Sequence, residues 1–363
     1  MSVVTSPGAA SIAWPSSIRP LHLIVGAFLI AYPFVATPFW IVQIGAQSLF
    51  LGVIALSLMF LAGYGGMVSL SQMTVAGCAG YAIALLGMND KNKGLMAMTL
   101  EAPNDPSGAL LQLYLPWWAL IPAAVLVATL IATLIGVLAV RTAGIYTIMI
   151  TLAIGMAFFT FTLQNYVIFN GHSGFGFIPV PVVLGINWRD PLPFYYLSLA
   201  VAAVSYFAVV YVARSPFGLS LQAIRDNPRR MNALGFNVYL HRVAAHAFAG
   251  FIAALGGVLL VWMNQRISPG TIDIGPLIDI LVIAVLGGLR HPVGPFIGAV
   301  VFILLQNFAI DLIDRERFNT LIGAVFLLIV LFSPDGLLGL WQRFVGWAKS
   351  AGGAGGWRQN RSS

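Results

Sequence analysis

The sequence predicts an all-α protein, a polytopic bundle of transmembrane helices with about ten membrane segments and both termini in the cytoplasm. Two observations lead to this fold class. Of the 363 residues, 59% are hydrophobic and only 8% are charged, whereas a soluble domain carries about a quarter charged residues. Apolar runs of roughly 20 residues, the length that a helix needs to cross a bilayer, recur along the chain.

These apolar runs define the predicted membrane segments. The stretch at 276–289 is short, because a helix rises about 1.5 Å per residue and this one would cover about 21 Å. We expect it to be a tilted, broken or re-entrant segment that protein buries. No separate short apolar region precedes the first run, so we expect an uncleaved first helix rather than a signal peptide. The runs lie at 21–40, 43–62, 69–88, 115–140, 144–168, 193–213, 242–263, 276–289, 292–312 and 319–340.

The distribution of basic residues sets the expected orientation. With a cytoplasmic N-terminus and alternating sides, 12 of the 18 Lys and Arg residues fall in cytoplasmic segments, the side that these residues favour. The net charge of +7 therefore reports topology, and we expect no nucleic-acid partner. Residues 1–20 and 342–363 are the predicted cytoplasmic tails around a transmembrane domain at 21–341. The C-terminal tail is expected to be disordered, and its basic residues could contact membrane lipid.

The sequence lacks the patterns of common catalytic and metal sites. No Gly-rich loop ends in Gly-Lys-Ser or Gly-Lys-Thr, so we find no P-loop for nucleotide hydrolysis. His241 and His246 are five residues apart and do not share a helical face as metal ligands would. Cys78 is the single cysteine and allows no internal disulfide. We expect no cofactor, no metal and no enzymatic activity in this chain.

Two features inside the predicted membrane segments have alternative interpretations. Asp279 lies three residues from the start of its predicted segment, where the helix dipole stabilises a carboxylate. We therefore favour a structural role over a proton relay, although buried charges often mark transport pathways. The run GYGGMVSLSQMTVAGCAGYA is rich in small residues, which allow close helix packing or form a broken helix that lines a pathway. Both interpretations of this run stay open.

One basic insert, residues 214–241, separates two apolar runs and reads RSPFGLSLQAIRDNPRRMNALGFNVYLH. It predicts two short helices. Ser215 and Asn227 can each cap a helix, because a side-chain oxygen accepts a hydrogen bond from a free amide at the helix start. Pro216 and Pro228 follow these caps, and proline suits the first helical turn. Gly235 supplies the left-handed residue that ends the second helix.

The second helix of the basic insert is about two turns long, too short to be stable alone. Met231 and Leu234 lie three residues apart, so we expect them to share a face. Arg229 and Arg230 flank them. The helix is either an interfacial element whose arginines stay on the cytoplasmic side or a knob that fits a groove on a cytoplasmic partner. The pair of capped helices favours the interpretation as a contact with a cytoplasmic partner.

The basic insert and the segment after it, down to VAAHAFAGFIAALGGVLL, resemble the cytoplasmic coupling loop and following helix of permease subunits in ABC importers for branched-chain amino acids. LivM-type permeases are the more similar branch. The family's N-terminal Gly-rich segment is similar to the stretch ALSLMFLAGYGGMVSLSQMTVAGCAGYAIALL. Its central segment is similar to LAVRTAGIYTIMITLAIGMAFF. Its C-terminal segments are similar to ISPGTIDIGPLIDILVIAVLGGLRHPVGPFIGAVVF and LFSPDGLLGLW. Together these stretches cover most of residues 45–341.

The resemblance implies a multi-pass permease subunit in the inner (plasma) membrane of a bacterial-type cell. It would pair with a second, homologous permease, two cytoplasmic ATPases and a periplasmic or extracellular solute-binding protein. The residues implied for ATPase coupling are Ala223, Arg225, Asp226, Asn227, Arg229, Arg230, Ala233, Leu234 and Gly235. Candidates for the substrate pathway or for docking of the binding protein are Gly63, Tyr64, Gly65, Ser69, Gln72, His172 and Ser173.

Two departures from the family pattern bear on the solute. The central segment, TLAIGMAFF, lacks the acidic residue that often follows its Thr-Leu pair, and the outer loop reads FNGHSGFGF instead of Thr-Gly-Gly followed by x-Asn-Gly. We therefore expect a branched-chain amino acid or a related small solute such as an amide, urea or an aromatic acid. The alternative is a stand-alone secondary transporter or channel, which should carry buried charged pairs or visible repeats.

Overall fold

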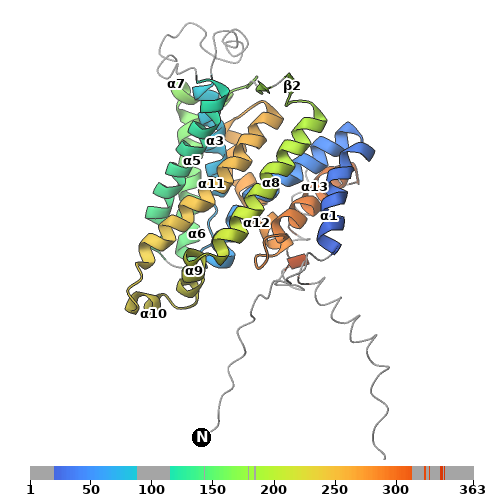
Figure 1. The fold of residues 1–363 in the computed structure, drawn as a ribbon. Helices are drawn as coiled ribbons and strands as arrows, with labels where there is room; N and C mark the ends of the chain where they lie inside the picture. Colours follow the sequence, from blue (N-terminus) through green and yellow to red (C-terminus); the bar gives the residue numbers. More distant parts are fainter. Residues whose placement is uncertain are drawn as a thin grey trace, which may run out of the picture.

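The structure is a computed structural model that describes residues 20–87 and 115–312, apart from 143, 179 and 184, and a few positions between 323 and 339. These residues form a bundle of roughly aligned helices (Figure 1). The predicted N-terminal tail, the outer segment at 89–114, most of the predicted last membrane segment at 319–340 and the C-terminal tail lie outside the described residues.

Within the described ranges the chain is almost entirely helical, as the sequence predicts. Two short strands form a minimal antiparallel hairpin, in which Val182 lies opposite Asn187. In chain order the elements are α1 (Pro20–Val35), η1 (Trp40–Ala46), α2 (Gln47–Met59), η2 (Phe60–Tyr64), α3 (Gln72–Leu86), α5 (Trp117–Ala139), α6 (Ile145–Gln164), α7 (Tyr166–Phe169), β1 (Val182–Val183), β2 (Ile186–Asn187), α8 (Pro191–Arg214), α9 (Pro216–Asp226), α10 (Pro228–Ala233), α11 (Val238–Asn264), η4 (Pro269–Ile272), α12 (Ile274–Gly287) and α13 (Gly294–Leu312).

Six helices in the described ranges are long and apolar enough to cross a membrane. Two shorter apolar helices, Gln72–Leu86 and Gly294–Phe308, accompany them. This is a multi-pass arrangement, while the predicted number of about ten segments remains a prediction. The six are Trp40–Tyr64, Trp117–Ala139, Ile145–Gln164, Pro191–Arg214, Val238–Asn264 and Pro269–Gly287.

The segment predicted to be short is longer than its apolar run. The 3-10 turn η4 and α12 together form a 19-residue stretch, Pro269–Gly287, that is long enough to cross. The stretch is interrupted at Asp273, which is extended between η4 and α12, so a broken or re-entrant segment stays a prediction. Pro269, Gly270 and Gly275 interrupt the apolar pattern ahead of 276. Proline is accepted at a helix start, where its missing amide costs no hydrogen bond, so these residues do not end the segment.

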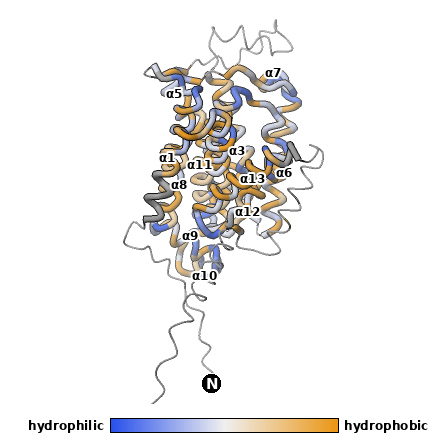
Figure 2. The backbone as a smooth tube through the Cα atoms, turned by 90° about the vertical axis from the view of Figure 1, so that its right-hand side faces the viewer, coloured by the Kyte–Doolittle hydropathy of each residue, from blue (hydrophilic) through white to orange (hydrophobic). Residues whose placement is uncertain are grey.

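α11 occupies the middle of the bundle and contacts α2, α3 and α5. Glycines make this packing close: Gly257 lies against the backbone of Ala76, and Gly250 lies against Ala132. Small residues let helix backbones approach in an apolar environment, where packing rather than water exclusion holds helices together. Figure 2 shows hydrophobic residues along the length of the bundle and hydrophilic ones gathered mainly toward its two ends.

The two ends of the bundle carry different structures. α9 and α10 lie at one end, and α7 with the β1–β2 hairpin lies at the other (Figure 1). The two helices of the basic insert are therefore separated from the outer loop by the full length of the bundle. This separation matches the opposite sides that the charge distribution predicts for these segments.

Candidate functional site

The first helix of the basic insert begins as the sequence predicts. Ser215 is extended, and its hydroxyl accepts a hydrogen bond from the amide of Gly218 at 3.3 Å. Asn227 starts α10 in the same way, because its side-chain oxygen accepts from the amide of Arg230 at 3.0 Å. A proline follows each cap, as expected. These local hydrogen bonds give the basic insert its two-helix form.

The end of α10 is also as predicted. Gly235 has a φ of +89°, a left-handed conformation that costs glycine little. Its amide donates to the carbonyl of Asn232, and the amide of Phe236 donates to the carbonyl of Met231. This pair of bonds is a Schellman motif, which satisfies carbonyls that the helix end would otherwise leave free.

A third cap was missed in the sequence. Asn237 accepts a hydrogen bond from the amide of Leu240 at 3.0 Å and starts α11 at Val238, four residues before the predicted apolar run. The signal was available, since Asn is a preferred cap residue. His241 and Arg242 obscured it by delaying the apolar pattern.

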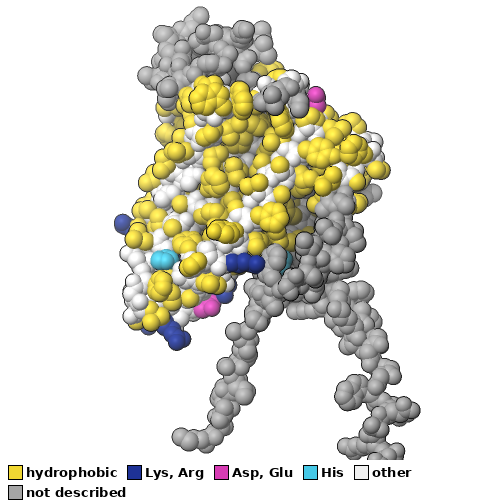
Figure 3. Space-filling model, viewed as in Figure 1, with side chains coloured by type: hydrophobic (Ala, Val, Ile, Leu, Met, Phe, Trp, Pro, Cys, Tyr) yellow, Lys and Arg dark blue, Asp and Glu magenta, His cyan; other side chains and the backbone are white. Residues whose placement is uncertain are grey.

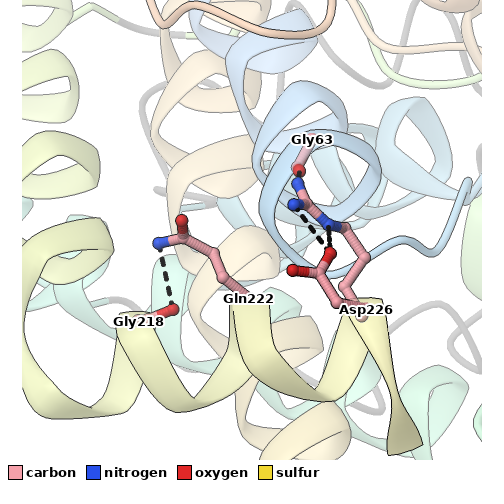
Figure 4. Close-up of polar contacts among 5 residues, drawn as sticks. Gly63, Gly218, Gln222 and Asp226 are labelled. Atoms are coloured by element: carbon pink, nitrogen blue, oxygen red, sulfur yellow. Dashed lines mark hydrogen bonds and ion pairs between the residues drawn. The ribbon is translucent and has the colours of Figure 1, made fainter. Parts of the chain in front are cut away.

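α9 is anchored to the bundle. Leu221 and Ile224 are fully buried, and α9 contacts α8, α11 and η2. The side-chain amide of Gln222 donates to the carbonyl of Ala213 at 2.9 Å, at the end of α8, and to that of Gly218 within α9 (Figure 4). α9 is therefore fixed to the transmembrane helices on one face.

α10 is exposed apart from Met231, which is buried, and Pro228, which is half-buried. Met231 is 8% exposed, whereas Leu234 is 66% exposed. The expectation that these two share a face was wrong, because Leu234 caps the helix end instead of continuing it. We call the exposed part of this helix and its end the α10 surface. It consists of Arg229, Arg230, Asn232, Ala233, Leu234, Gly235 and Phe236.

The α10 surface combines exposed apolar side chains with arginines. Leu234 and Phe236 are exposed next to Arg229 and Arg230. On the face of the molecule shown in Figure 3, basic side chains lie mainly toward the end that carries α9 and α10. Exposed apolar groups rimmed by charges are typical of a protein contact surface.

Arg225 links the basic insert to the end of the membrane-capable helix Trp40–Tyr64. Its Nη1 donates a hydrogen bond to the carbonyl of Gly63, and its Nε and Nη2 contact the carboxylate of Asp226 at 3.0 and 2.9 Å (Figure 4). Gly66 has a φ of +66°, and a β-carbon there would lie 2.5 Å from Cγ of Arg225. The side chain of Arg225 therefore lies directly against the chain where α2 and its continuation η2 end.

The helix is broken between η2 and α3. Residues 65–71 are not helical, and they are held by polar contacts within the protein. Ser57 donates to the side chain of Gln72 at 3.0 Å, Ser69 and Ser71 are 2.9 Å apart, and the amide of Leu70 donates to the hydroxyl of Thr151 at 3.1 Å. Non-helical backbone at membrane depth is tolerated only where protein or water satisfies it.

The Gly-rich run thus combines a non-helical segment with close helix packing, while a pathway lined by it stays a prediction. Its first half forms the break at 65–71, while Gly77 and Gly80 in α3 lie directly against Ile272 and Val261. Tyr64, at the end of η2, packs its ring against Phe60. The broken segment and the close helix packing use different glycines of the same run.

The outer loop lies at the other end of the molecule, next to the end of α11. Phe175 pairs with Ile267 in an isolated antiparallel bridge, and the guanidinium of Arg266 donates to the carbonyl of Ser173 at 3.1 Å. His172 is exposed. The loop conformation depends on Asn170, which has a φ of +57° and donates to the carbonyl of Gly174 at 2.7 Å.

The candidate residues therefore fall into three places. Gly63 accepts from Arg225 at the inner end, next to Tyr64 at the end of η2. Gly65 and Ser69 belong to the broken segment, and Gln72 is the first residue of α3. His172 and Ser173 lie in the outer loop, away from the other candidates. Among the described residues, no group of three His, Cys, Asp or Glu side chains is placed to hold a metal ion.

Comparison with known proteins identifies a family. The model of a family described as the permease component of branched-chain amino acid transport systems matches residues 40–331. The high-affinity branched-chain amino acid transport system permease protein LivM of Salmonella typhimurium is 24% identical over 255 residues, which are 63% of this chain and 60% of that protein. The corresponding protein BraD of Pseudomonas aeruginosa is 26% identical over 197 residues, 52% of this chain and 62% of BraD.

A sugar permease also matches. The ribose import permease protein RbsC of Haemophilus influenzae is 24% identical over 245 residues, 64% of this chain and 73% of that protein. The chain spans less than two thirds of the length of LivM and BraD. No solved structure matches the chain.

Proposed function

The chain belongs to the family of permease components of branched-chain amino acid transport systems, and from this premise we propose that it is the transmembrane permease subunit of an ABC importer. In this proposal it forms part of the translocation pathway, and ATP is hydrolysed on partner ATPase subunits. The solute is a branched-chain amino acid or a related small molecule such as an amide, urea or an aromatic acid. The range of similar permeases, which includes one named for ribose, supports a family that varies its solute.

The proposed assembly contains a second, homologous permease, two cytoplasmic ATPases and an outer solute-binding protein. Residues 21–341 are the transmembrane domain, with 214–241 as its cytoplasmic loop and both termini in the cytoplasm of a bacterial-type inner membrane. The α10 surface docks in a groove of an ATPase, as a helix does when it places its apolar side chains in a partner's groove. His172 and Ser173 face the binding protein at the opposite end.

The observation that carries the mechanism is the hydrogen bond from Arg225 to the carbonyl of Gly63. An ATPase that moves α10 also moves α9, since the two helices pack against each other. α9 then acts on the end of η2 through Arg225, directly next to the broken segment at 65–71. Such segments have few helical hydrogen bonds to lose, so they suit a change between inward-open and outward-open states.

A stand-alone secondary transporter or channel is the alternative. Its expected marks are buried charged pairs in the membrane segments. Arg225 and Asp226 form an ion pair that lies in the basic insert and not in the bundle. The importer is favoured because it also gives the α10 surface a partner.

Reconstitution tests the proposal and separates it from the alternative. The chain is placed in liposomes alone or with its permease, ATPase and binding-protein partners, and uptake of radiolabelled leucine, urea and benzoate is measured with and without ATP. We expect uptake of at least one solute only with the partners and ATP. Uptake by the chain alone without ATP would contradict the importer and support the alternative.

Arg225→Met sharpens the same experiment. The methionine keeps an apolar stem beside Gly66 and removes the donors to Gly63. We expect ATPase subunits to co-purify as with the wild type, while uptake per ATP hydrolysed falls about tenfold or more, since a hydrogen bond from a charged group contributes about 1.5–3 kcal/mol. Arg229→Met is the matched control: Arg229 lies on the α10 surface, so its loss should weaken co-purification and leave uptake per ATP hydrolysed unchanged.

A further inference from the structure

A cavity of about 190 Å³ opens between the helices at the end of the bundle opposite the basic insert. Its position follows from its lining: Asn264 is the last residue of α11, and α11 begins directly after α10. A cavity of about 150 Å³ accommodates a benzene molecule, so this one has room for a small solute. Neither the coupling residues nor the outer loop contribute to it.

Polar side chains from five elements line this cavity. Gln47 comes from α2, Asn264 from α11, Thr271 from η4, Asp279 from α12 and Gln306 from α13. Within the described part of the chain, the structure records no side-chain hydrogen bond or ion pair for Asp279, Gln47 or Gln306. Polar groups inside a membrane protein normally have partners, because an unpaired one is costly to desolvate.

The free amides at the start of α12 do not explain why a carboxylate lies at position 279. The sequence places it near the beginning of its membrane segment, where free amides stabilise a carboxylate. In the structure α12 begins earlier, at Ile274, and its cap is Asp273, whose carboxylate accepts from the amide of Ile274 at 2.7 Å. Asp279 is the sixth residue of α12, beyond the four free amides of a helix start. A structural role at the helix terminus is therefore excluded by the geometry, and the carboxylate faces the cavity.

The rest of the lining is apolar. Phe50, Leu51, Ile280 and Phe302 surround the polar groups. A site of this kind has few polar groups that fix orientation and an apolar wall that contacts the remainder of the ligand. A carboxylate in such surroundings favours a cation, and the carboxamides of Gln47 and Gln306 can donate to an anionic or carbonyl oxygen of the same ligand.

We propose that this cavity is a binding site for a small solute with an ammonium group and an apolar body, in which Asp279 contacts the ammonium group. The inference deepens the proposed function, on which it rests for the direction of transport. It places a solute site in the outer half of the helix bundle, between the end where the binding protein is proposed to dock and the broken segment. Among the solutes considered for the importer, it favours amino acids over aromatic acids and urea.

Cysteine labelling tests the site on the full chain in detergent micelles, without any partner. In a Cys78→Ala background, Gln306→Cys places a thiol in the cavity wall. Its reaction rate is measured with a cationic methanethiosulfonate, the ethyltrimethylammonium reagent, and an anionic one, the ethylsulfonate. We expect the cationic reagent to react faster, and Asp279→Asn to lower the ratio of the two rates on the order of tenfold, because a nearby unit charge acts oppositely on the two reagents.

Two variants of the same helix serve as controls. Asp279→Glu keeps the charge and should keep the rate ratio within about twofold. Asp273→Asn removes a carboxylate outside the cavity and keeps a good helix cap, so it should also leave the ratio unchanged. Thermal unfolding and size-exclusion elution confirm that each variant is folded before its rates are compared. A thiol that does not react, or a ratio that does not depend on Asp279, overturns the proposal.

Protection by small molecules tests the ligand class. Leucine and 3-methylbutylamine carry an ammonium group, while 4-methylpentanoate has a similar apolar body without one. We expect the first two to slow labelling at millimolar concentration about tenfold and the third to have no effect. Protection by 4-methylpentanoate alone, or by none of the three, contradicts an ammonium site.

The outcomes separate this proposal from the proposed function. If labelling depends on Asp279 but uptake needs neither partners nor ATP, the site stands and the importer does not. If uptake needs ATP and partners but the ratio of labelling rates does not depend on Asp279, the proposed importer function is supported and the proposed site is wrong.

Discussion

α9 and α10 are neighbours with nearly the same start, yet their surroundings are opposite. Each follows an extended polar cap residue and begins with proline. α9 buries Leu221 and Ile224 against the bundle and connects to Gly63 through Arg225. α10 buries only Met231 and exposes Leu234 and Phe236. The same local start therefore gives one helix that packs against the transmembrane helices and one that is exposed on the surface of the protein.

The difference indicates a division of labour within the basic insert. A side chain of α9 should matter for the stability of the permease itself. A side chain of the α10 surface should matter for association with an ATPase and leave the isolated permease unchanged. Substitutions in the two helices can confirm or contradict this division.

The largest effect is expected in α9. Leu221→Ala should lower the free energy of unfolding by about 3 kcal/mol, because a fully buried leucine loses its contacts and leaves a cavity. Unfolding of the purified chain in mixed detergent micelles measures the change. Leu219→Ala is the matched control in the same helix: this leucine is 59% exposed, and its loss should change the free energy by less than about 0.5 kcal/mol. Equal effects of the two variants would show that α9 is not anchored.

A smaller effect is expected at the end of α10. Gly235→Val should cost about 2 kcal/mol locally, because a residue with a β-carbon is strained in the left-handed conformation; a β-carbon itself would meet no atom within 4 Å. We expect faster hydrogen exchange at Gly235 and Phe236, weaker stimulation of the ATPase and normal membrane insertion.

Gly235→Asn is the control, since asparagine adopts the left-handed conformation more readily. It should restore most of the protection from exchange. If the valine and asparagine variants exchange alike and stimulate the ATPase like the wild type, the Schellman motif does not shape the α10 surface.

The smallest effect in free energy is expected at the exposed leucine. Leu234→Ala should leave unfolding unchanged and weaken binding of the ATPase subunit about tenfold, which corresponds to about 1.4 kcal/mol. Biolayer interferometry with the permease in nanodiscs measures the affinity. Leu219→Ala again serves as the control, now for binding. An unchanged affinity in Leu234→Ala would remove the α10 surface from the proposed interface.

Sequence patterns predicted the two helices of the basic insert because their boundaries depend on local contacts. Ser215, Asn227 and Gly235 act within a few residues of themselves, so their roles can be derived from residue type and spacing. The same patterns failed for the buried and exposed faces of α10. Leu234 was assigned to the face of Met231 from spacing alone, but the helix ends before that spacing applies.

The candidate site could be predicted only in part. Gly63 and Ser69 were singled out from a Gly-rich run, but their relation to the basic insert was not visible. Arg225 and Gly63 are 162 residues apart, and no periodic pattern indicates a contact over that separation. The cavity around Asp279 was missed for the same reason, since its five polar groups come from five different elements.

By itself, the sequence determined that this chain is a helical membrane protein, that it has a capped two-helix insert, and that it resembles a permease family. These properties depend on the length of the apolar runs, on hydrogen bonds between residues close in sequence and on the order of the motifs, all of which can be read from the sequence. Only the tertiary structure decided that α9 is anchored while α10 is exposed, that Arg225 contacts the broken helix, and that Asp279 faces a cavity instead of capping a helix. Those properties depend on which distant helices pack together, and packing is a relation between segments that no single segment contains.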